Sequence, residues 1–119
     1  MKIYLSGAMR GLKDANFPAF DFAAKKLRAE GHTVVSPADM DRRMLGWQAG
    51  YLPSDAEIEM IDIRRCLLRD CQTILEWADT VAVLPGTPAT SKGAAAELAL
   101  ARAIQIPVMF LGGRYDAAC

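Results

Sequence analysis

Glu97 is the residue whose sequence surroundings most strongly indicate chemistry. It lies in an expected helix, residues 93–104, and its neighbours three and four positions away on either side are glycine, alanine, leucine and alanine. No basic side chain is therefore placed to form an ion pair along the helix, and the carboxylate shares the face that should pack. A carboxylate on such a face is paired from another element, protonated or functional. A helix rotated so that Glu97 reaches water is the alternative, and the spacing leaves both interpretations open.

Asp70 shows the same feature in another expected helix. Its neighbours three and four positions away are cysteine, leucine, threonine and isoleucine, again without a basic partner. The adjacent Arg69 allows a simpler interpretation, in which Asp70 is a solvated carboxylate beside a guanidinium. The residues alone slightly favour this simpler interpretation, and they leave a functional role open.

Two loops contain groups that bind anions. Ser91, Lys92 and Gly93 stand at the start of the helix that carries Glu97, where free N–H groups and the helix dipole favour a phosphate. Ser91 is equally suited to be an ordinary N-cap, and both uses can coexist. The other loop, residues 6–11, is flanked by glycine and offers one cation, Arg10. It matches neither G-x-G-x-x-G nor a P-loop, so read alone it is a weak signal.

Other kinds of site find little support in the residue types. His32 is the only histidine and directly precedes an expected strand, so we interpret it as structural and expect neither a metal site nor a Ser-His-Asp triad. The cysteines are odd in number and form no C-x-x-C pair, which argues against a disulfide framework or a zinc ribbon. They are Cys66, Cys71 and Cys119.

Composition limits the partners and the compartment. The 119 residues carry a formal net charge of zero, so no basic excess exists to hold a nucleic-acid polymer. No apolar run approaches the ~20 residues of a membrane span, and the first residues form a strand pattern rather than a signal peptide. We therefore expect a cytoplasmic protein whose partner is a small molecule, with no membrane or nucleic-acid polymer bound.

The elements that position these residues alternate along the chain. Strands are expected at 3–6, 33–36, 80–84 and 107–111, and helices from about 16 or 18 to 30, from the capping box at 54 to about 78, and over 93–104. Residues 38–53 are expected to be a loop with at most one helical turn, in which Trp47 and Tyr51 either stack on a base or cover the core. This order predicts one domain, 1–119, with a three-layer flavodoxin- or Rossmann-like α/β fold. Its mainly parallel sheet of four to five strands would have helices on both faces and bind its ligand at the strands' carboxyl ends.

Taken in order, these segments resemble nucleoside 2-deoxyribosyltransferase-like proteins, most closely the 2′-deoxynucleoside 5′-phosphate N-hydrolases. Residues 3–11, Ile-Tyr-Leu-Ser-Gly-Ala-Met-Arg-Gly, resemble the opening of those hydrolases. Residues 91–97, Ser-Lys-Gly-Ala-Ala-Ala-Glu, resemble their S-x-G-x-x-x-E segment, whose glutamate is the nucleophile. Asp70 is placed like the family's catalytic aspartate, on the helix before the third strand. Short bacterial and phage proteins of unknown function show similar spacing, and the resemblance covers nearly the whole chain.

The resemblance implies a role for each matching residue. Glu97 would attack the anomeric carbon and form a covalent deoxyribosyl-enzyme, as in retaining glycoside hydrolysis. Tyr4 would lie against that carboxylate, and Asp70 would donate a proton to the departing base. Ser91 and Arg10 match positions that contact the 5′-phosphate. The residues expected to bind substrate are Ser6, Gly7, Met9, Arg10, Ser91 and Gly93.

The residue six positions before the nucleophile distinguishes two activities of this family. Transferases that act on free nucleosides commonly carry an acid there, which would repel a phosphate dianion. Here the residue is Ser91, with Lys92 beside it. The resemblance therefore implies hydrolysis of a 2′-deoxynucleoside 5′-monophosphate without a cofactor, with base exchange by a nucleoside 2-deoxyribosyltransferase as the alternative. It also implies a homodimer or a higher even homo-oligomer. Members of this family often take a polar site residue from the C-terminal segment of a neighbouring subunit, and the tail here, residues 112–119, has no clear match to it.

Two further classes compete with this interpretation. Phosphoribohydrolases carry a PGGxGT-x-x-E segment, which Leu84-Pro85-Gly86 followed by Glu97 resembles only faintly, because the second glycine and the close glutamate are missing. The same fold also serves non-catalytic nucleotide sensors. The joint presence of Tyr4, Asp70 and Glu97 argues against a sensor.

Overall fold

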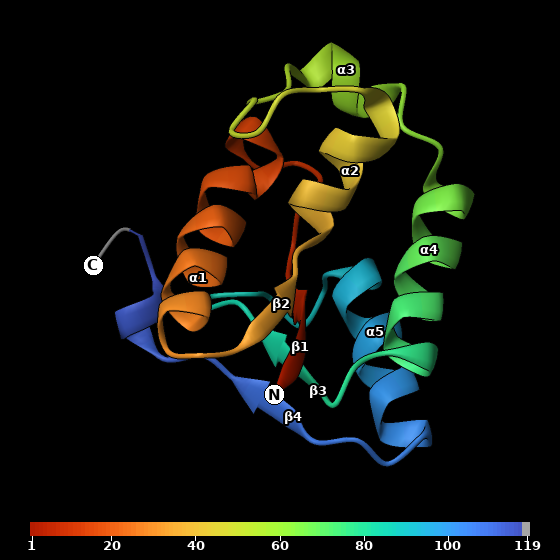
Figure 1. Ribbon diagram of the computed structural model, residues 1–119. Coiled ribbons are helices and arrows are strands. Elements are labelled where there is room, and N and C mark those ends of the chain that lie inside the picture. Colours follow the sequence, from red (N-terminus) through yellow and green to blue (C-terminus); the bar gives the residue numbers. More distant parts are fainter. Residues whose placement is uncertain (118–119) are drawn as a thin grey trace.

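Strands and helices alternate along the chain (Figure 1), and the structure, a computed structural model, describes residues 1–117. The strands are β1 (Lys2–Ser6), β2 (Thr33–Val35), β3 (Thr80–Val83) and β4 (Val108–Phe110). The α-helices are α1 (Phe17–Ala29), α2 (Pro37–Leu45), α3 (Asp55–Glu59), α4 (Ile63–Glu76) and α5 (Lys92–Ala103). Two short 3-10 helices are η1 (Lys13–Asn16) and η2 (Gly113–Tyr115).

Within the described residues, the four strands form one parallel sheet in the order β2-β1-β3-β4. β1 is an inner strand, and its Tyr4 pairs with Val35 on one side and Val81 on the other. The predicted α/β class with a parallel sheet is therefore confirmed. In such sheets ligands bind at the carboxyl ends of the strands, so the loops after β1 and β3 stand where a site is expected.

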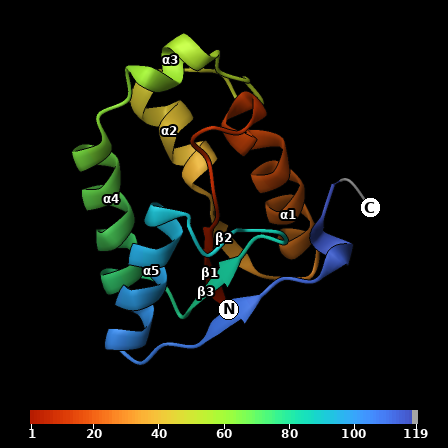
Figure 2. The same cartoon turned by 180° about the vertical axis from the view of Figure 1, so that it is seen from behind.

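Helices cover both faces of the sheet, as Figures 1 and 2 show from opposite sides. Successive strand side chains point to opposite faces, so Ile3 and Leu5 pack toward α1, whereas Tyr4 and Ser6 lie toward α5. The core beneath α1 includes Ile3, Leu5, Phe17, Phe20, Ala23, Ala24 and Leu27. The core beneath α4 and α5 contains Tyr4, Ile74, Val81 and Ala101.

The prediction of a loop over residues 38–53 is wrong, because α2 occupies Pro37–Leu45. Pro37 stands in the first turn, where its missing N–H costs no hydrogen bond. Gly46 ends the helix with a left-handed φ of 72°, a conformation that favours glycine. The buried side of this helix includes the charged residues Asp41 and Arg42. The apolar pattern that reveals most helices is therefore weak here.

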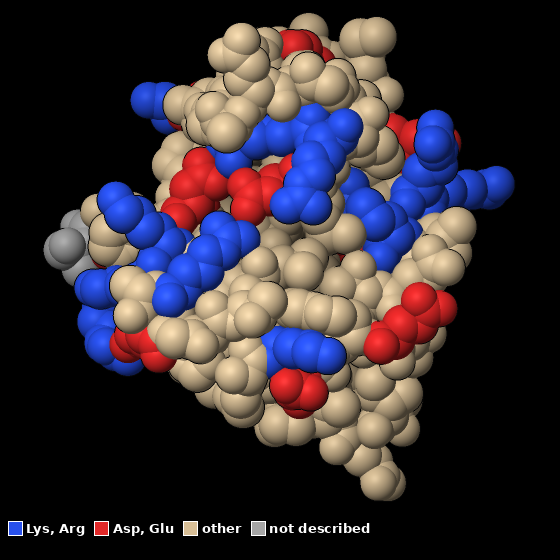
Figure 3. All heavy atoms as spheres, viewed as in Figure 1, with Lys and Arg blue, Asp and Glu red and all other residues tan. Residues whose placement is uncertain are grey.

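Ion pairs hold α2 in place. The Arg42 guanidinium is buried, and its Nη1 and Nη2 atoms each lie 2.8 Å from a carboxylate oxygen of Asp21 on α1. The same guanidinium stacks 4.9 Å from the ring centroid of Phe17. Figure 3 shows acidic and basic side chains lying beside one another on this face of the molecule. These contacts explain how a helix with few apolar residues packs.

The predicted single helix from residue 54 to about 78 is also wrong, because the structure divides it into α3 and α4. The capping box at Ser54 is confirmed: its hydroxyl accepts from the Glu57 N–H at 3.2 Å, and the Glu57 carboxylate accepts from the Ser54 N–H at 3.0 Å. Asp62 then caps a second helix by accepting from the N–H groups of Arg64 and Arg65. A second N-cap inside the expected helix is the physical reason for the break.

Among residues 1–117, no helix combines the length and the apolar character that crossing a membrane requires.

Candidate functional site

The Glu97 carboxylate lies buried at the carboxyl end of β1, with 5 % of the residue exposed. The Tyr4 hydroxyl donates to its Oε2 atom at 2.6 Å, and the Ser6 hydroxyl donates to its Oε1 atom at 2.7 Å. The alternative of a rotated helix that exposes Glu97 is therefore wrong. Both oxygens are held by strand residues, so the carboxylate is fixed in one orientation.

Burial controls the charge of this carboxyl group. Desolvation raises the pKa of Glu97 to about 7, and the negative charge of Asp70 adds to the rise. The hydrogen bonds from Tyr4 and Ser6 act in the opposite direction because they stabilise the ionised form. Burial also raises the pKa of Tyr4 well above its ordinary value, with the charge of Glu97 as the second cause. Tyr4 therefore remains a hydrogen-bond donor wherever Glu97 ionises.

Asp70 is also buried, so its interpretation as a solvated carboxylate is wrong. Its Oδ1 atom accepts from Nε of Arg69 at 3.0 Å and from Nη2 at 2.8 Å. The partner that the sequence suggested is therefore present, but the pair lies inside the protein. Desolvation raises the pKa of Asp70, and the Arg69 charge and hydrogen bonds oppose that rise.

A cavity of about 600 Å³ joins these carboxyl groups to the two loops. The loop after β1 and the segment before α5 both reach it, and Tyr4 and Ser6 lie behind Glu97. Gly7 lets the two loops approach closely, because a Cβ atom there would lie 2.8 Å from Cδ1 of Leu84. The sequence-predicted residues that line the cavity are Gly7, Met9, Arg10, Asp70, Ser91, Gly93 and Glu97.

Ser91 occupies the N-cap position of α5, yet within the described residues its side chain makes no capping hydrogen bond. Its hydroxyl is therefore available to another acceptor or donor at the cavity wall. Arg10 is only lightly engaged, because its Nη2 atom donates to the Ile61 carbonyl at 3.3 Å. Both residues line the cavity that also reaches Glu97.

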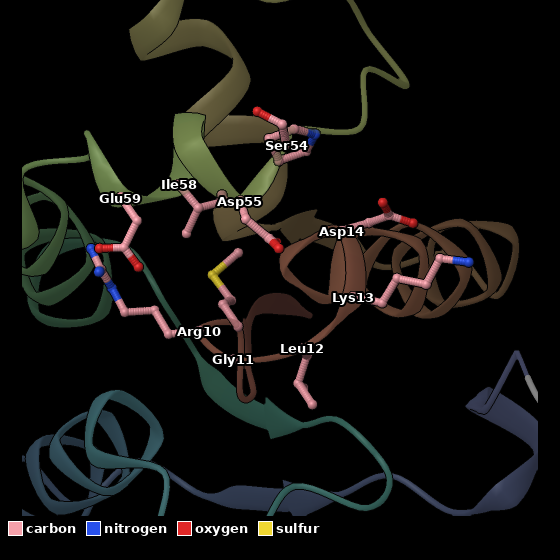
Figure 4. A pocket seen from close by; sticks show the side chains of 11 residues that line it. Arg10, Gly11, Leu12, Lys13, Asp14, Ser54, Asp55, Ile58 and Glu59 are labelled. Atoms are coloured by element: carbon pink, nitrogen blue, oxygen red, sulfur yellow. The ribbon is translucent and has the colours of Figure 1, made fainter.

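A second cavity of about 680 Å³ adjoins the first, and the two share Met9, Arg10, Leu12 and Ile58. Figure 4 shows Arg10 reaching toward Glu59 at one side of this space, with Asp55 and Asp14 on the opposite side. Lys13 and Ser54 also line it. Its wall mixes both signs of charge and is not uniformly basic.

Sequence reasoning missed Asp41, which lines the same cavity as Glu97 and is 4 % exposed. Its Oδ1 atom lies 2.8 Å from Nη1 of Arg69, and it also accepts from the Cys66 thiol at 3.8 Å. Burial, followed by the charge of Asp41, raises the pKa of Cys66 to about 11, so the thiol stays protonated. The buried positions of α2 recur at the spacing of one helix face: Pro37, Ala38, Asp41 and Arg42. This spacing is the signal that could have revealed Asp41.

Other predicted features lie away from the cavity. Trp47 is partly buried against the core, and its ring lies 5.1 Å from that of Tyr51, which is exposed. Nδ1 of His32 accepts from the amino group of Met1 at 3.3 Å, at the amino edge of the sheet. Arg114 and Tyr115 bind Glu30, which directly follows α1, and Cys119 lies outside the described residues.

In the part of the chain that the structure describes, no group of three or more His, Cys, Asp or Glu side chains is arranged to hold a metal ion. What the site offers is three buried carboxyl groups, those of Asp41, Asp70 and Glu97, together with the buried Tyr4 and the Arg69 guanidinium.

A protein-family model described as a domain of unknown function (DUF4406) matches residues 1–110. No curated protein matches the chain. No solved structure matches it either.

Proposed function

This chain belongs to the DUF4406 family, and from its site we propose that it hydrolyses the N-glycosidic bond of a 2′-deoxynucleoside 5′-monophosphate. The observation that carries the proposal is the Glu97 carboxylate, buried at a cavity wall and held by Tyr4 and Ser6. A desolvated carboxylate fixed by two hydroxyl donors is a suitable nucleophile, because little reorganisation is needed before attack.

The proposed reaction has two steps. The ionised Glu97 carboxylate attacks C1′, and the C1′–N bond breaks with its electron pair leaving on the base. Asp70, protonated at the time, gives its proton to the base. A water molecule then attacks C1′, the ester bond to Glu97 breaks, and the proton from the water returns to Asp70. Atoms and charges balance, and no cofactor enters.

The two carboxyl groups given these roles lie in different environments. Both carboxyl groups are buried and have raised pKa values, yet each has a different partner. Glu97 is held only by neutral hydroxyl groups, which stabilise its ionised form by hydrogen bonds. Two carboxyl groups whose environments differ in one cavity are a common basis for an acid and a nucleophile.

Arg10 and Ser91 support the choice of a phosphorylated substrate. Both line the cavity from opposite loops, and the Ser91 position opens a helix of twelve residues whose first N–H groups favour an anion. A neutral hydroxyl there tolerates a phosphate dianion, which a carboxylate would repel.

The direct test is a screen for base release. Each 2′-deoxynucleoside 5′-monophosphate is incubated with the protein, and the free base is separated by chromatography. The matching deoxynucleosides, ribonucleotides and a second acceptor base are included. Release from deoxynucleoside monophosphates is the expected result. Transfer of deoxyribose to the acceptor base would favour the transferase, and tight binding without release of any base would favour a sensor.

A further inference from the structure

The Arg69 guanidinium is shared by two buried carboxylates that come from different helices. Its Nη1 atom lies 2.8 Å from Oδ1 of Asp41 on α2, and its Nη2 atom lies 2.8 Å from Oδ1 of Asp70 on α4. Nε of Arg69 donates to the same Asp70 oxygen at 3.0 Å. The planar guanidinium thus spans the gap between α2 and α4, with one edge used by each carboxylate.

The three side chains differ in their relation to the cavity. Asp41 and Asp70 line it, whereas Arg69 stands behind them in contact with Sδ of Met44. A substrate in the cavity would therefore meet the carboxylates, and the guanidinium would act on the substrate only through them.

Stability alone is a weak reason for such an arrangement. One guanidinium serves two buried carboxylates, so the desolvation of two anions is offset by a single cation. Asp70 could be neutralised by Arg69 without Asp41, because the two residues are neighbours on α4. Asp41 adds a second negative charge beside the guanidinium, and this charge makes ionisation of Asp70 less favourable.

We propose that Asp41 is a positioning residue for Asp70, on which it acts by sharing the Arg69 guanidinium and keeping it from pairing with Asp70 alone. This inference rests on the proposed function only in the role given to Asp70 as proton donor. The Asp41–Arg69–Asp70 arrangement itself is independent of the reaction.

The groups that face Asp70 determine the effect of removing Asp41. Arg69 lowers the pKa of Asp70, as does the nearby Tyr4 hydroxyl, whereas the charge of Asp41 raises it. Glu97 on α5 also faces Asp70, because the charge of Asp70 raises the Glu97 pKa. The thiols of Cys66 and Cys71 lie close enough for the charge of Asp70 to raise their pKa values too. Without Asp41, Arg69 is left to one carboxylate, and Asp70 then gives up its proton more readily.

The test measures Asp70 directly and does not require turnover. The side-chain carboxyl carbon of Asp70 is followed by carbon-13 NMR as pH is varied, with assignment by the signal lost in Asp70→Asn. In Asp41→Asn the midpoint of the Asp70 titration should fall by about half a pH unit or more. The matched control is Asp39→Asn on the same helix. Asp39 binds Arg28 and Arg42 instead, so the Asp70 midpoint should stay unchanged.

Activity supplies a second readout. The limb of the kcat/KM profile that reports loss of the proton on Asp70 should move to lower pH in Asp41→Asn, with KM changed less than about threefold. Asp41→Glu keeps the negative charge, so this limb of its profile should lie closer to the wild-type pH than the limb of Asp41→Asn does.

Two results would overturn the inference: an unchanged Asp70 midpoint in folded Asp41→Asn, or a rise in KM without a shift of the profile, which would make Asp41 a substrate contact. If Asp41→Asn does not fold, the reciprocal variant Asp70→Asn is used. It must lower the midpoint of the Asp41 titration, because coupling between two sites is mutual. An unchanged Asp41 midpoint would contradict the proposal. Absence of base release would refute the proposed function alone, since the NMR titration is still measured.

Discussion

The Tyr4 hydroxyl donates to Oε2 of Glu97 at 2.6 Å across a sequence separation of 93 residues. Tyr4 is on the inner strand β1 and Glu97 is in the second turn of α5, so the fold itself brings the pair together. The hydrogen bond lowers the pKa of Glu97 against the larger effect of burial. Tyr4 thus keeps Glu97, the proposed nucleophile, ionised closer to neutral pH.

Replacing this hydroxyl should therefore change the pH dependence of activity. In Tyr4→Phe the pKa of Glu97 should rise further, and kcat/KM at pH 6 should fall by roughly tenfold if the rise is about one unit. Part of the loss should be recovered above pH 8, where Glu97 ionises without help. Tyr51→Phe is the matched control, because Tyr51 donates to Glu57 at the surface, away from Glu97. A uniform loss at every pH would show that Tyr4 acts in some other way.

Removing the carboxylate tests the nucleophile. Glu97→Gln should fold, since an amide can still accept from Tyr4 and donate to Ser6, yet base release should fall by several orders of magnitude. Glu76→Gln, an exposed residue at the end of α4, should retain normal release. Product formation is measured by chromatography after extended incubation. Near wild-type turnover in folded Glu97→Gln would exclude the covalent mechanism.

The sequence predicted the sheet and the main helices because their signals are local. β1 and β3 are short apolar runs, and α1 has a regular apolar spacing. The break at Asp62 was missed because a single capping side chain outweighed a continuing helical pattern. α2 was missed because its buried side contains Asp41 and Arg42, which bind residues far away in the sequence.

The site was only partly predictable for the same reason. The small apolar neighbours of Glu97 indicated a buried carboxylate, and this spacing is a local property. Its hydroxyl partners come from β1, and only the resemblance to a family indicated Tyr4. For Ser6 the structure gives a contact with Glu97 rather than a place in the cavity wall. The link from Asp41 to Asp70 depends on how α2 packs against α4, and no local pattern contains that information.

Arg10 gives a test of the phosphate assignment. Arg10→Ala should lower kcat/KM for a deoxynucleoside monophosphate by about tenfold or more, because a charge-assisted hydrogen bond to phosphate is lost. The value for the corresponding nucleoside should change little. Arg102→Ala, an exposed arginine at the far end of α5, is the matched control. Equal losses for the nucleotide and the nucleoside would contradict the assignment.

We also predict an even homo-oligomer, with a dimer as the smallest form. Several large apolar side chains are exposed on α4 and in the segment between α2 and α4: Leu52, Met60, Ile63 and Leu68. A partner copy that covered them would bury apolar surface and enclose the site. Light scattering should give twice the mass of one chain or a multiple of it, and Leu68→Glu should reduce that mass. A monomer with full activity would show that each chain builds its site alone.

The raised pKa of Glu97 predicts a stability that depends on pH. The group titrates near 4.5 when the chain is unfolded and near 7 when it is folded. The folded state therefore binds the proton more tightly, so this contribution is present in full below pH 4.5 and is lost as pH rises through 7. Glu97→Gln removes this penalty. Relative to the wild type, its free energy of unfolding should increase by roughly 2–3 kcal/mol between pH 5 and pH 8.

Urea unfolding of both proteins at pH 5 and pH 8 measures this difference, and the subtraction cancels carboxyl groups that titrate alike in both. Glu76→Gln should give no such change, because that side chain is exposed. The same experiment separates two explanations for a loss of activity in Glu97→Gln. A variant that is inactive yet more stable than the wild type at pH 8 has lost a group that the fold holds at an energetic cost, as expected for a nucleophile. A variant that is less stable at both pH values would instead make Glu97 part of the framework.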